Sequence, residues 1–305
     1  MPMIQGDGVE LYAEEAGDGH PIVWLHEFAA DYRTWEGQIR RFSRSHRCVA
    51  YNARGYPPSD VPDSDAAYTF EREREDLRAV LDSLGIERAH IVGLSMGAYT
   101  GLMFALRYPK RVMSLLFASG GSGAFGDTRE AFLAEVRAAA EAMMNEGMEV
   151  AAERLAVGAT RVQLQNKDPR GWEEFKQYLS EHSPVGSGLT MRNFQAGRPS
   201  LYDFEADLRQ LDVPVLLVVG DEDDPVIETN VFLKRVLPRA GLWIAPRTGH
   251  GINLEEPAAF NQMAADFFSA VEAGQWTRRD PRADPAHASL GGASPGRRHR
   301  DGSSA

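Results

Sequence analysis

Residues 89–97 read AHIVGLSMG, and this stretch decides the predicted fold. Its first six residues form a nearly continuous apolar run, which is typical of a strand buried on both faces of a sheet. A helical pattern follows from Ser95 and ends before Pro109. Ser95 is therefore expected on a tight turn between strand and helix, where Gly93 and Gly97 relieve crowding and the hydroxyl faces solvent.

The same alternation of short apolar runs with helical stretches extends along most of the chain. It predicts an α/β protein with a mostly parallel, doubly wound sheet that is covered by helices on both faces. Residues 9–15 alternate apolar and polar side chains, so we expect them in an antiparallel hairpin at the sheet edge. The expected central strands are 21–26, 47–51, 89–94, 112–118, 214–220 and 241–245. The clearest expected helices between them are 70–84 and 95–108.

One interval breaks this alternation. Roughly 90 residues separate the strand that ends near Ala118 from the strand that begins at Pro214, against the few that an ordinary connection needs. Much of the interval is helical in period, which indicates an inserted helical lid rather than a loop. We therefore expect the chain to divide into an α/β core, 1–118 and 206–273, a lid, 119–205, and a tail, 274–305.

Composition and charge narrow the classes of partner. The chain has 305 residues, of which 43% are hydrophobic and 25% charged, so the composition argues against disorder or coiled coil for the chain as a whole. A net charge of −11 disfavours nucleic acid and anionic membranes as partners. No apolar run approaches a membrane span, and the N-terminus has no signal-like stretch. With Cys48 as the single cysteine, we expect a cytoplasmic protein without disulfides.

The last part of the chain has a different composition. From Gln275 onward it is rich in Arg, Pro, Gly, Ala, Ser and Asp and has almost no apolar residues, so we expect it to be disordered. An RNA-binding or targeting arm is the alternative interpretation. Residues 292–296 repeat the pattern G-x-S-x-G, but they have no strand or helix around them, and Ser294 is assigned no role.

Two stretches supply the groups that a serine nucleophile needs. A serine hydroxyl is weakly nucleophilic without a positioned base, and the base needs a third group to orient it. The strand at 214–220 runs into DEDD at 221–224, and the strand at 241–245 is followed by GHG at 249–251. Because His250 lies between two glycines on a loop, it is predicted to be the base. The order serine, acid, histidine on a parallel sheet is typical of this architecture.

Stabilising the oxyanion of an acyl-transfer reaction requires two N–H donors that point at the same place. One is expected from Met96, directly after the nucleophile, and the other from Phe28 in the loop after the strand 21–26. His26 ends this strand. We interpret it as a residue that shapes the loop and lies beside the substrate, rather than as a second base.

With these motifs the chain resembles the α/β-hydrolase superfamily, and most closely its lid-bearing serine esterase, enol-lactonase and cofactor-free haloperoxidase branch. The resemblance runs over roughly residues 3–272. It implies that Asp223, rather than Asp221 or Asp224, is the acid that orients His250. The motifs that carry it are LHEF at 25–28, NARGYPPS at 52–59, GLSMG at 93–97, GDED at 220–223 and GH at 249–250.

Three positions depart from the pattern of that branch. The family usually has glycine where this chain has Glu27, aspartate where it has Asn52, and glycine where it has Pro57. Asn52 is expected to be structural. A carboxylate within ~7 Å of an oxyanion would cost about 2 kcal/mol at an effective dielectric of about 20. We therefore expect Glu27 to turn away, toward Arg54 or Arg33; selection of a cationic or hydrogen-bond-donating substrate is the alternative.

These observations predict a serine hydrolase that cleaves a carboxylic ester or lactone of a small, largely apolar substrate through an acyl-enzyme. The same triad, Ser95, Asp223 and His250, also serves carbon–carbon bond hydrolysis and perhydrolysis. A ligand-sensing binding protein with the same pocket is the alternative from another class.

The substrate pocket is expected between the sheet edge and the lid, with Trp172 and Tyr178 beside His26 as contacts for an apolar guest. No cofactor and no metal are expected, because the sequence contains no dinucleotide fingerprint, no Walker motif and no histidine pair at metal-binding spacing.

Overall fold

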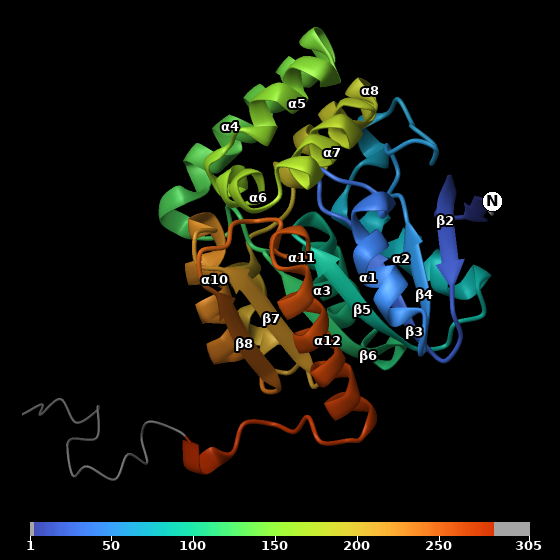
Figure 1. Cartoon of the computed structure of the whole chain (residues 1–305), viewed down its shortest axis with the longest axis vertical. Helices are drawn as coiled ribbons and strands as arrows, with labels where there is room; N and C mark the ends of the chain where they lie inside the picture. Colours follow the sequence, from blue (N-terminus) through green and yellow to red (C-terminus); the bar gives the residue numbers. More distant parts are fainter. Residues whose placement is uncertain (1–2, 284–305) are drawn as a thin grey trace, which may run out of the picture.

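The computed structural model describes residues 3–283 and arranges their strands in one eight-stranded sheet (Figure 1). The order is β1-β2-β4-β3-β5-β6-β7-β8; the pairs β1–β2 and β2–β4 are antiparallel and the others parallel. The strands are β1 (Met3–Gln5), β2 (Glu10–Ala16), β3 (His20–Leu25), β4 (His46–Tyr51), β5 (Ala89–Leu94), β6 (Val112–Ala118), β7 (Val215–Gly220) and β8 (Ala240–Ala245). This confirms the predicted α/β class.

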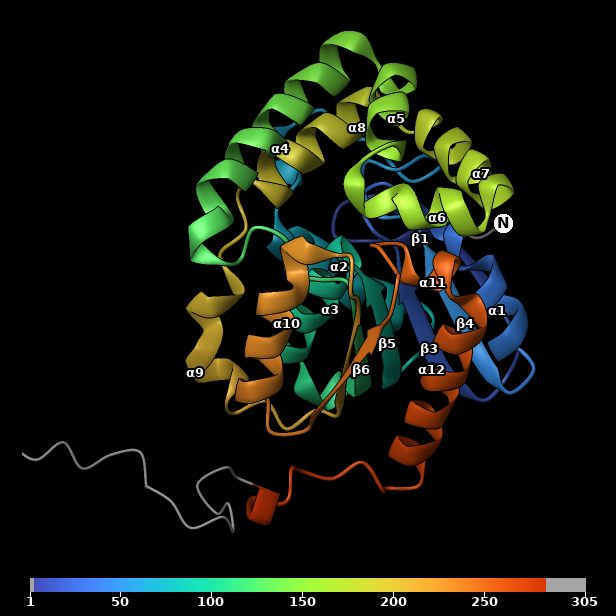
Figure 2. The same ribbon diagram turned by 60° about the vertical axis from the view of Figure 1, so that its left-hand side comes forward.

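Helices cover both faces of the sheet, so the central strands have a hydrophobic core on each side (Figure 2). Every residue of β5 and β7 is buried, which explains their continuous apolar sequences. Ile91 packs into the core on one face and Val92 into the core on the other. One face is covered by α2 (Phe70–Ser83), α3 (Met96–Arg107) and α10 (Asp224–Val236). The other face is covered by α1 (Glu36–Phe42) and α12 (Pro257–Glu272).

A second layer of helices lies above the sheet in the segment that we expected to form the lid (Figure 2). Its longest helix, α4, packs against α5 and α8, and α5 packs against α7. The chain is π-helical over Thr190–Gln195. The lid helices are α4 (Gly126–Glu146), α5 (Met148–Ala156), η4 (Ala159–Arg161), α6 (Val162–Lys167), α7 (Pro169–Ser180) and α8 (Pro184–Leu189).

Short helical turns complete the connections. They are η1 (Tyr32–Trp35), η2 (Asp65–Ala67), η3 (Pro109–Arg111), η6 (Leu201–Phe204), α9 (Glu205–Leu208), α11 (Ile252–Glu255) and η7 (Pro281–Ala283). Within residues 3–283, no helix combines the length and the apolar character that crossing a membrane requires.

The expectation that the tail is disordered from residue 274 is wrong for its first part. The ring of Trp276 packs edge-on against Phe267, with 4.6 Å between centroids, and its indole N–H donates to the carbonyl oxygen of Arg239 at 2.8 Å. One large aromatic side chain is sufficient to dock a segment whose average composition is polar. Residues 284–305, including the second G-x-S-x-G pattern, lie outside the described residues.

Candidate active site

Ser95 lies on the sharp turn that joins β5 to α3. Its φ of 53° and ψ of −105° are strained for an L-residue, and its N–H donates to Ala118 O at 2.8 Å. A Cβ on Gly93 would lie 2.3 Å from the carbonyl carbon of Gly97, and one on Gly97 would lie 2.3 Å from Leu25 O. Both positions therefore require glycine, and the turn presents a partly buried Ser95 at the carboxyl edge of the sheet.

Asp223 and His250 meet at the same edge, because the loops after β7 and β8 leave the sheet at its carboxyl end. The distance between His250 Nδ1 and Asp223 Oδ2 is 2.8 Å, and both side chains are buried. In the neutral ring Nδ1–H donates to the carboxylate, which leaves the Nε2 lone pair for a proton. Burial opposes the charged ring, but the Asp223 carboxylate outweighs it and raises the pKa of His250.

The neighbouring aspartates have other surroundings. Asp221 accepts the N–H of Thr248 at 3.2 Å, and Asp224 begins α10. Of the three aspartates that followed β7 in the sequence, Asp223 is the one that contacts His250.

The loop after β3 is held beside the start of α3. The hydroxyl of Tyr56 donates to Phe28 O at 3.0 Å and lies 3.9 Å from the sulfur of Met96. Phe28 and Met96 are both buried. Tyr56 therefore fixes the peptide that follows Phe28, and the first N–H groups of α3 favour a developing negative charge.

His26 is fixed by the main chain at both ring nitrogens. Nδ1 lies 2.7 Å from Glu27 O, and Nε2 accepts the N–H of Ala53 at 3.0 Å. Burial lowers the pKa of His26, so the ring is neutral, with its proton on Nδ1. It ties the loop after β3 to the loop after β4, and neither nitrogen is free to bind a substrate.

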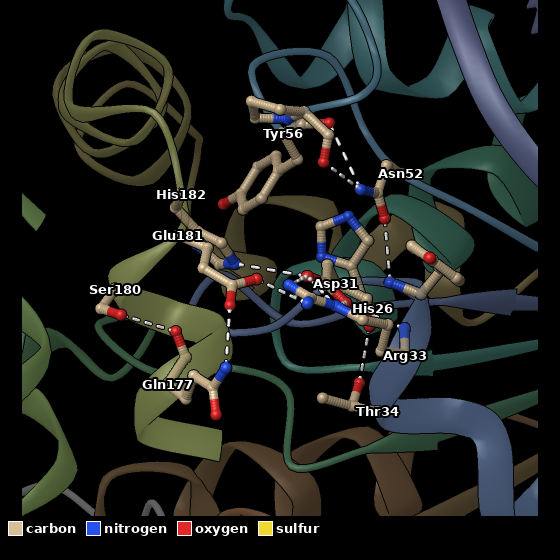
Figure 3. Close-up of polar contacts among 12 residues, drawn as sticks. His26, Asp31, Arg33, Thr34, Asn52, Tyr56, Gln177, Ser180, Glu181 and His182 are labelled. Carbon is tan, nitrogen blue, oxygen red and sulfur yellow. Dashed lines mark hydrogen bonds and ion pairs between the residues drawn. The ribbon is translucent and has the colours of Figure 1, made fainter. Parts of the chain in front are cut away.

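Asn52 has the structural role that the sequence predicted. Its side-chain oxygen accepts the N–H of Tyr32 at 2.9 Å, and its amide donates to Pro57 O at 2.8 Å (Figure 3). An amide can accept and donate at once, whereas an aspartate only accepts. The replacement therefore fits the rebuilt turn that contains Pro57.

The expected orientation of Glu27 is wrong. Its carboxylate points into the site, where Oε1 accepts from Arg161 Nη1 at 2.9 Å and Oε2 pairs with Arg161 Nη2. Oε2 also lies 3.7 Å from His250 Nε2. The two arginines that we expected as partners bind other acids: Arg54 pairs with Asp76 at 2.7 Å, and Arg33 pairs with Asp31 at 2.6 Å.

Arg161 is the site residue that sequence reasoning missed. It belongs to η4 of the lid, is 6% exposed, and lies over the ring of Phe175 with 4.7 Å between its central carbon and the ring centroid. Burial opposes ionisation of Glu27, but Arg161 outweighs it and lowers the pKa of that carboxyl. The signal that could have found it is Glu27 itself, because a buried carboxylate requires a cation.

The two lid aromatics that we predicted as substrate contacts have partners within the fold. The indole N–H of Trp172 donates to Ala156 O at 2.7 Å, and the ring of Tyr178 lies 3.9 Å from the guanidinium carbon of Arg33. Substrate contact by these two rings stays a prediction.

His182, which follows α7, lies beside the loop that follows β3. Its Nε2 is 3.8 Å from a carboxylate oxygen of Asp31, and its ring packs edge-on against Tyr56 with 5.1 Å between centroids (Figure 3). Burial lowers the pKa of His182 to about 4, although Asp31 opposes this shift. The lid therefore contacts the loop through a neutral histidine.

Comparison with known proteins identifies the family. The model of the α/β hydrolase fold matches residues 20–257, and the chain belongs to this family. It is 27% identical over 288 residues to a 2-hydroxy-6-oxononadienedioate/2-hydroxy-6-oxononatrienedioate hydrolase of Paraburkholderia xenovorans, covering 87% of this chain and 93% of that protein. It is 23% identical over 271 residues to 3-oxoadipate enol-lactonase 1 of Acinetobacter baylyi, covering 88% and 96%.

A solved structure agrees with this assignment. A thermophilic esterase from Thermogutta terrifontis superposes with a TM-score of 0.78 at 25% identity, covering 88% of this chain and 98% of the esterase. The predicted superfamily, and within it the esterase and enol-lactonase branch, are thereby confirmed. The first of these two relatives is named a hydrolase and the second an enol-lactonase.

Proposed function

We propose that this protein is a serine hydrolase that cleaves a carboxylic ester or lactone of a small, largely apolar substrate. The observation that carries the proposal is that three groups lie at the same carboxyl edge of the sheet. Ser95 lies on the strained turn after β5, and the buried, hydrogen-bonded pair of Asp223 and His250 lies on the loops after β7 and β8.

In the first half of the reaction Ser95 Oγ attacks the substrate carbonyl carbon, and its proton moves to His250 Nε2. Asp223 holds the ring at Nδ1 and stabilises the imidazolium. The N–H groups of Phe28 and Met96 stabilise the oxyanion. The intermediate then collapses: the carbon–oxygen bond to the leaving group breaks, and that oxygen takes the proton from Nε2.

In the second half a water molecule attacks the acyl-enzyme and gives a proton to His250. The bond between the acyl carbon and Ser95 then breaks, the serine oxygen recovers the proton from Nε2, and the carboxylic acid leaves. The enzyme returns to its starting state. Small-molecule sites are lined predominantly by apolar side chains, which favours an apolar group on the substrate.

Carbon–carbon bond hydrolysis on the same residues is the second candidate. It is favoured by the 27% identity to an enzyme named as a hydrolase of 2-hydroxy-6-oxononadienedioate, a name that describes hydroxyl, keto and carboxylate groups and no ester. Esters and vinylogous diketones presented side by side to the purified protein distinguish the two chemistries by their relative kcat/KM.

A serine-directed fluorophosphonate tests the proposal directly. It should label one peptide, the one that contains Ser95, and an activated p-nitrophenyl ester should release a burst of nitrophenol. Labelling should disappear in Ser95→Ala. Labelling at another residue, or undiminished ester turnover in Ser95→Ala, would refute the assignment, and binding without a burst would favour a ligand sensor.

A further inference from the structure

Glu27 and Arg161 lie against the ring nitrogen that the reaction needs. Glu27 Oε2 is 3.7 Å from His250 Nε2, while both carboxylate oxygens bind the guanidinium of Arg161. We propose that Arg161 is a positioning residue: it holds the Glu27 carboxylate off His250 and so keeps Nε2 available to the proton of Ser95. The proposal rests on the proposed function, since it takes His250 to be the base.

The need for such a residue follows from the burial of Glu27, which is 2% exposed. A buried carboxylate without a partner is strongly driven to take a charge-assisted hydrogen bond. After Arg161, the protonated Nε2 of His250 is the donor that lies nearest to the Glu27 carboxylate, at 3.7 Å. Once bound to Glu27, that N–H would be withheld from the leaving group, and the imidazolium would be stabilised before any substrate had reacted.

Among the charges around His250, Arg161 is the one that opposes the binding of protonated Nε2 by Glu27. Glu255 adds negative charge beneath the loop by accepting the N–H groups of the glycines on both sides of His250, at 2.6 and 3.1 Å. Arg161 is the cation that faces both Glu27 and Asp223. Asp223, Arg161 and Glu27 act on the His250 ring itself, whereas Lys167 acts on Glu255 and His26 acts on Glu27.

The main chain holds Arg161 in place. The carbonyl oxygen of Thr160, its neighbour in η4, accepts the N–H of His250 at 2.9 Å. A Cβ on Gly249 would lie 2.2 Å from the same oxygen, so the loop and the lid approach as closely as a glycine permits. The lid segment that carries Arg161 is thus docked on the loop that carries the base, and the position of one determines that of the other.

A cycle of variants tests the proposal: Arg161→Gln, Glu27→Gln and the double variant, each measured as kcat/KM against pH on a neutral p-nitrophenyl ester. Arg161→Gln should lower kcat/KM at pH 7 at least tenfold and move the acid limb to higher pH, because the unpaired Glu27 stabilises the imidazolium. Glu27→Gln should move the acid limb to lower pH. The double variant should recover most of the activity that Arg161→Gln loses.

The matched control is Glu181→Gln. It removes another ion pair between lid and body, the one that Glu181 forms with Arg33 Nη1 at 2.6 Å (Figure 3). It should leave kcat/KM within about twofold of wild type and the acid limb within about 0.2 pH of wild type. Arg161→Lys keeps the cation and should retain more activity than Arg161→Gln. This variant also tests the proposal if Arg161→Gln folds poorly.

Several results would overturn the positioning role. A double variant as inactive as Arg161→Gln would assign Arg161 to substrate binding or lid folding instead, and an unshifted acid limb in Glu27→Gln would remove the electrostatic basis. If wild type turns over the ester and is labelled at Ser95, either of these two results overturns the positioning role and leaves the proposed function intact. A wild type with neither turnover nor labelling of Ser95 overturns the proposed function, and the positioning role falls with it.

Discussion

Replacing Asp223 with asparagine should lower kcat on an activated ester about 10⁴-fold with little change in stability. The structure provides the magnitude. Asp223 Oδ2 lies 2.8 Å from His250 Nδ1, and both side chains are almost fully buried. At an effective dielectric of about 20, two unit charges at this separation interact by about 6 kcal/mol. A 10⁴-fold loss corresponds to about 5.4 kcal/mol, so the loss of the charge accounts for the expected effect.

The assay is steady-state turnover of a p-nitrophenyl ester by wild type, Asp223→Asn and two matched controls, Asp221→Asn and Asp224→Asn. The controls should lose less than tenfold, because Asp221 accepts the main-chain N–H of Thr248 and Asp224 is the first residue of α10, whereas His250 Nδ1 pairs with Asp223. Turnover of Asp223→Asn within tenfold of wild type would refute the reasoning. So would a loss in Asp224→Asn as large as that in Asp223→Asn.

Three further changes test other parts of the molecule. Ser95→Ala and His250→Ala should each abolish ester turnover, and the double variant should be no worse than either, since members of a triad act as a unit; additive losses would contradict this. Trp276→Ala, like truncation after Ala273, should lower the free energy of unfolding in urea by about 1–2 kcal/mol, because it exposes a partly buried ring; an unchanged midpoint would show that the segment is not docked. The neutral, buried His182 has a pKa of about 4, below its unfolded value near 6.5, so its contribution to stability is complete above about pH 6.5 and is lost as pH falls toward 4. His182→Phe should flatten this loss in urea titrations between pH 7 and 4, and an unchanged slope would exclude His182 as its source.

The strands and the turn at Ser95 were predictable because their causes are local. A strand buried on both faces needs a continuous apolar run, and each central strand has one within six or seven residues. The turn needs glycine at positions 93 and 97, where a Cβ would strike the main chain. The choice of Asp223 came from the resemblance to the family and not from a local cause, because Asp221, Asp223 and Asp224 all follow the same strand end.

Glu27 and Trp276 were misjudged because their partners are remote. The guanidinium that binds Glu27 is 134 residues away in the sequence, in a lid segment that no motif marks. Trp276 stands in a stretch whose composition is polar, and its binding surface is made by Phe267 and Arg239. Neither the charge balance nor the helical period of a segment carries information about such pairings.

The sequence by itself therefore determined the elements, their order and the turn that carries Ser95, since apolar periodicity and glycine sterics act within a few residues. Only the tertiary structure decided which charges surround His250. Coulombic and hydrogen-bonding partners are selected by distances of a few ångströms in space, and these depend on how the lid docks on the loop after β8. The pairing of Glu27 with Arg161 beside His250 is the consequence of that docking.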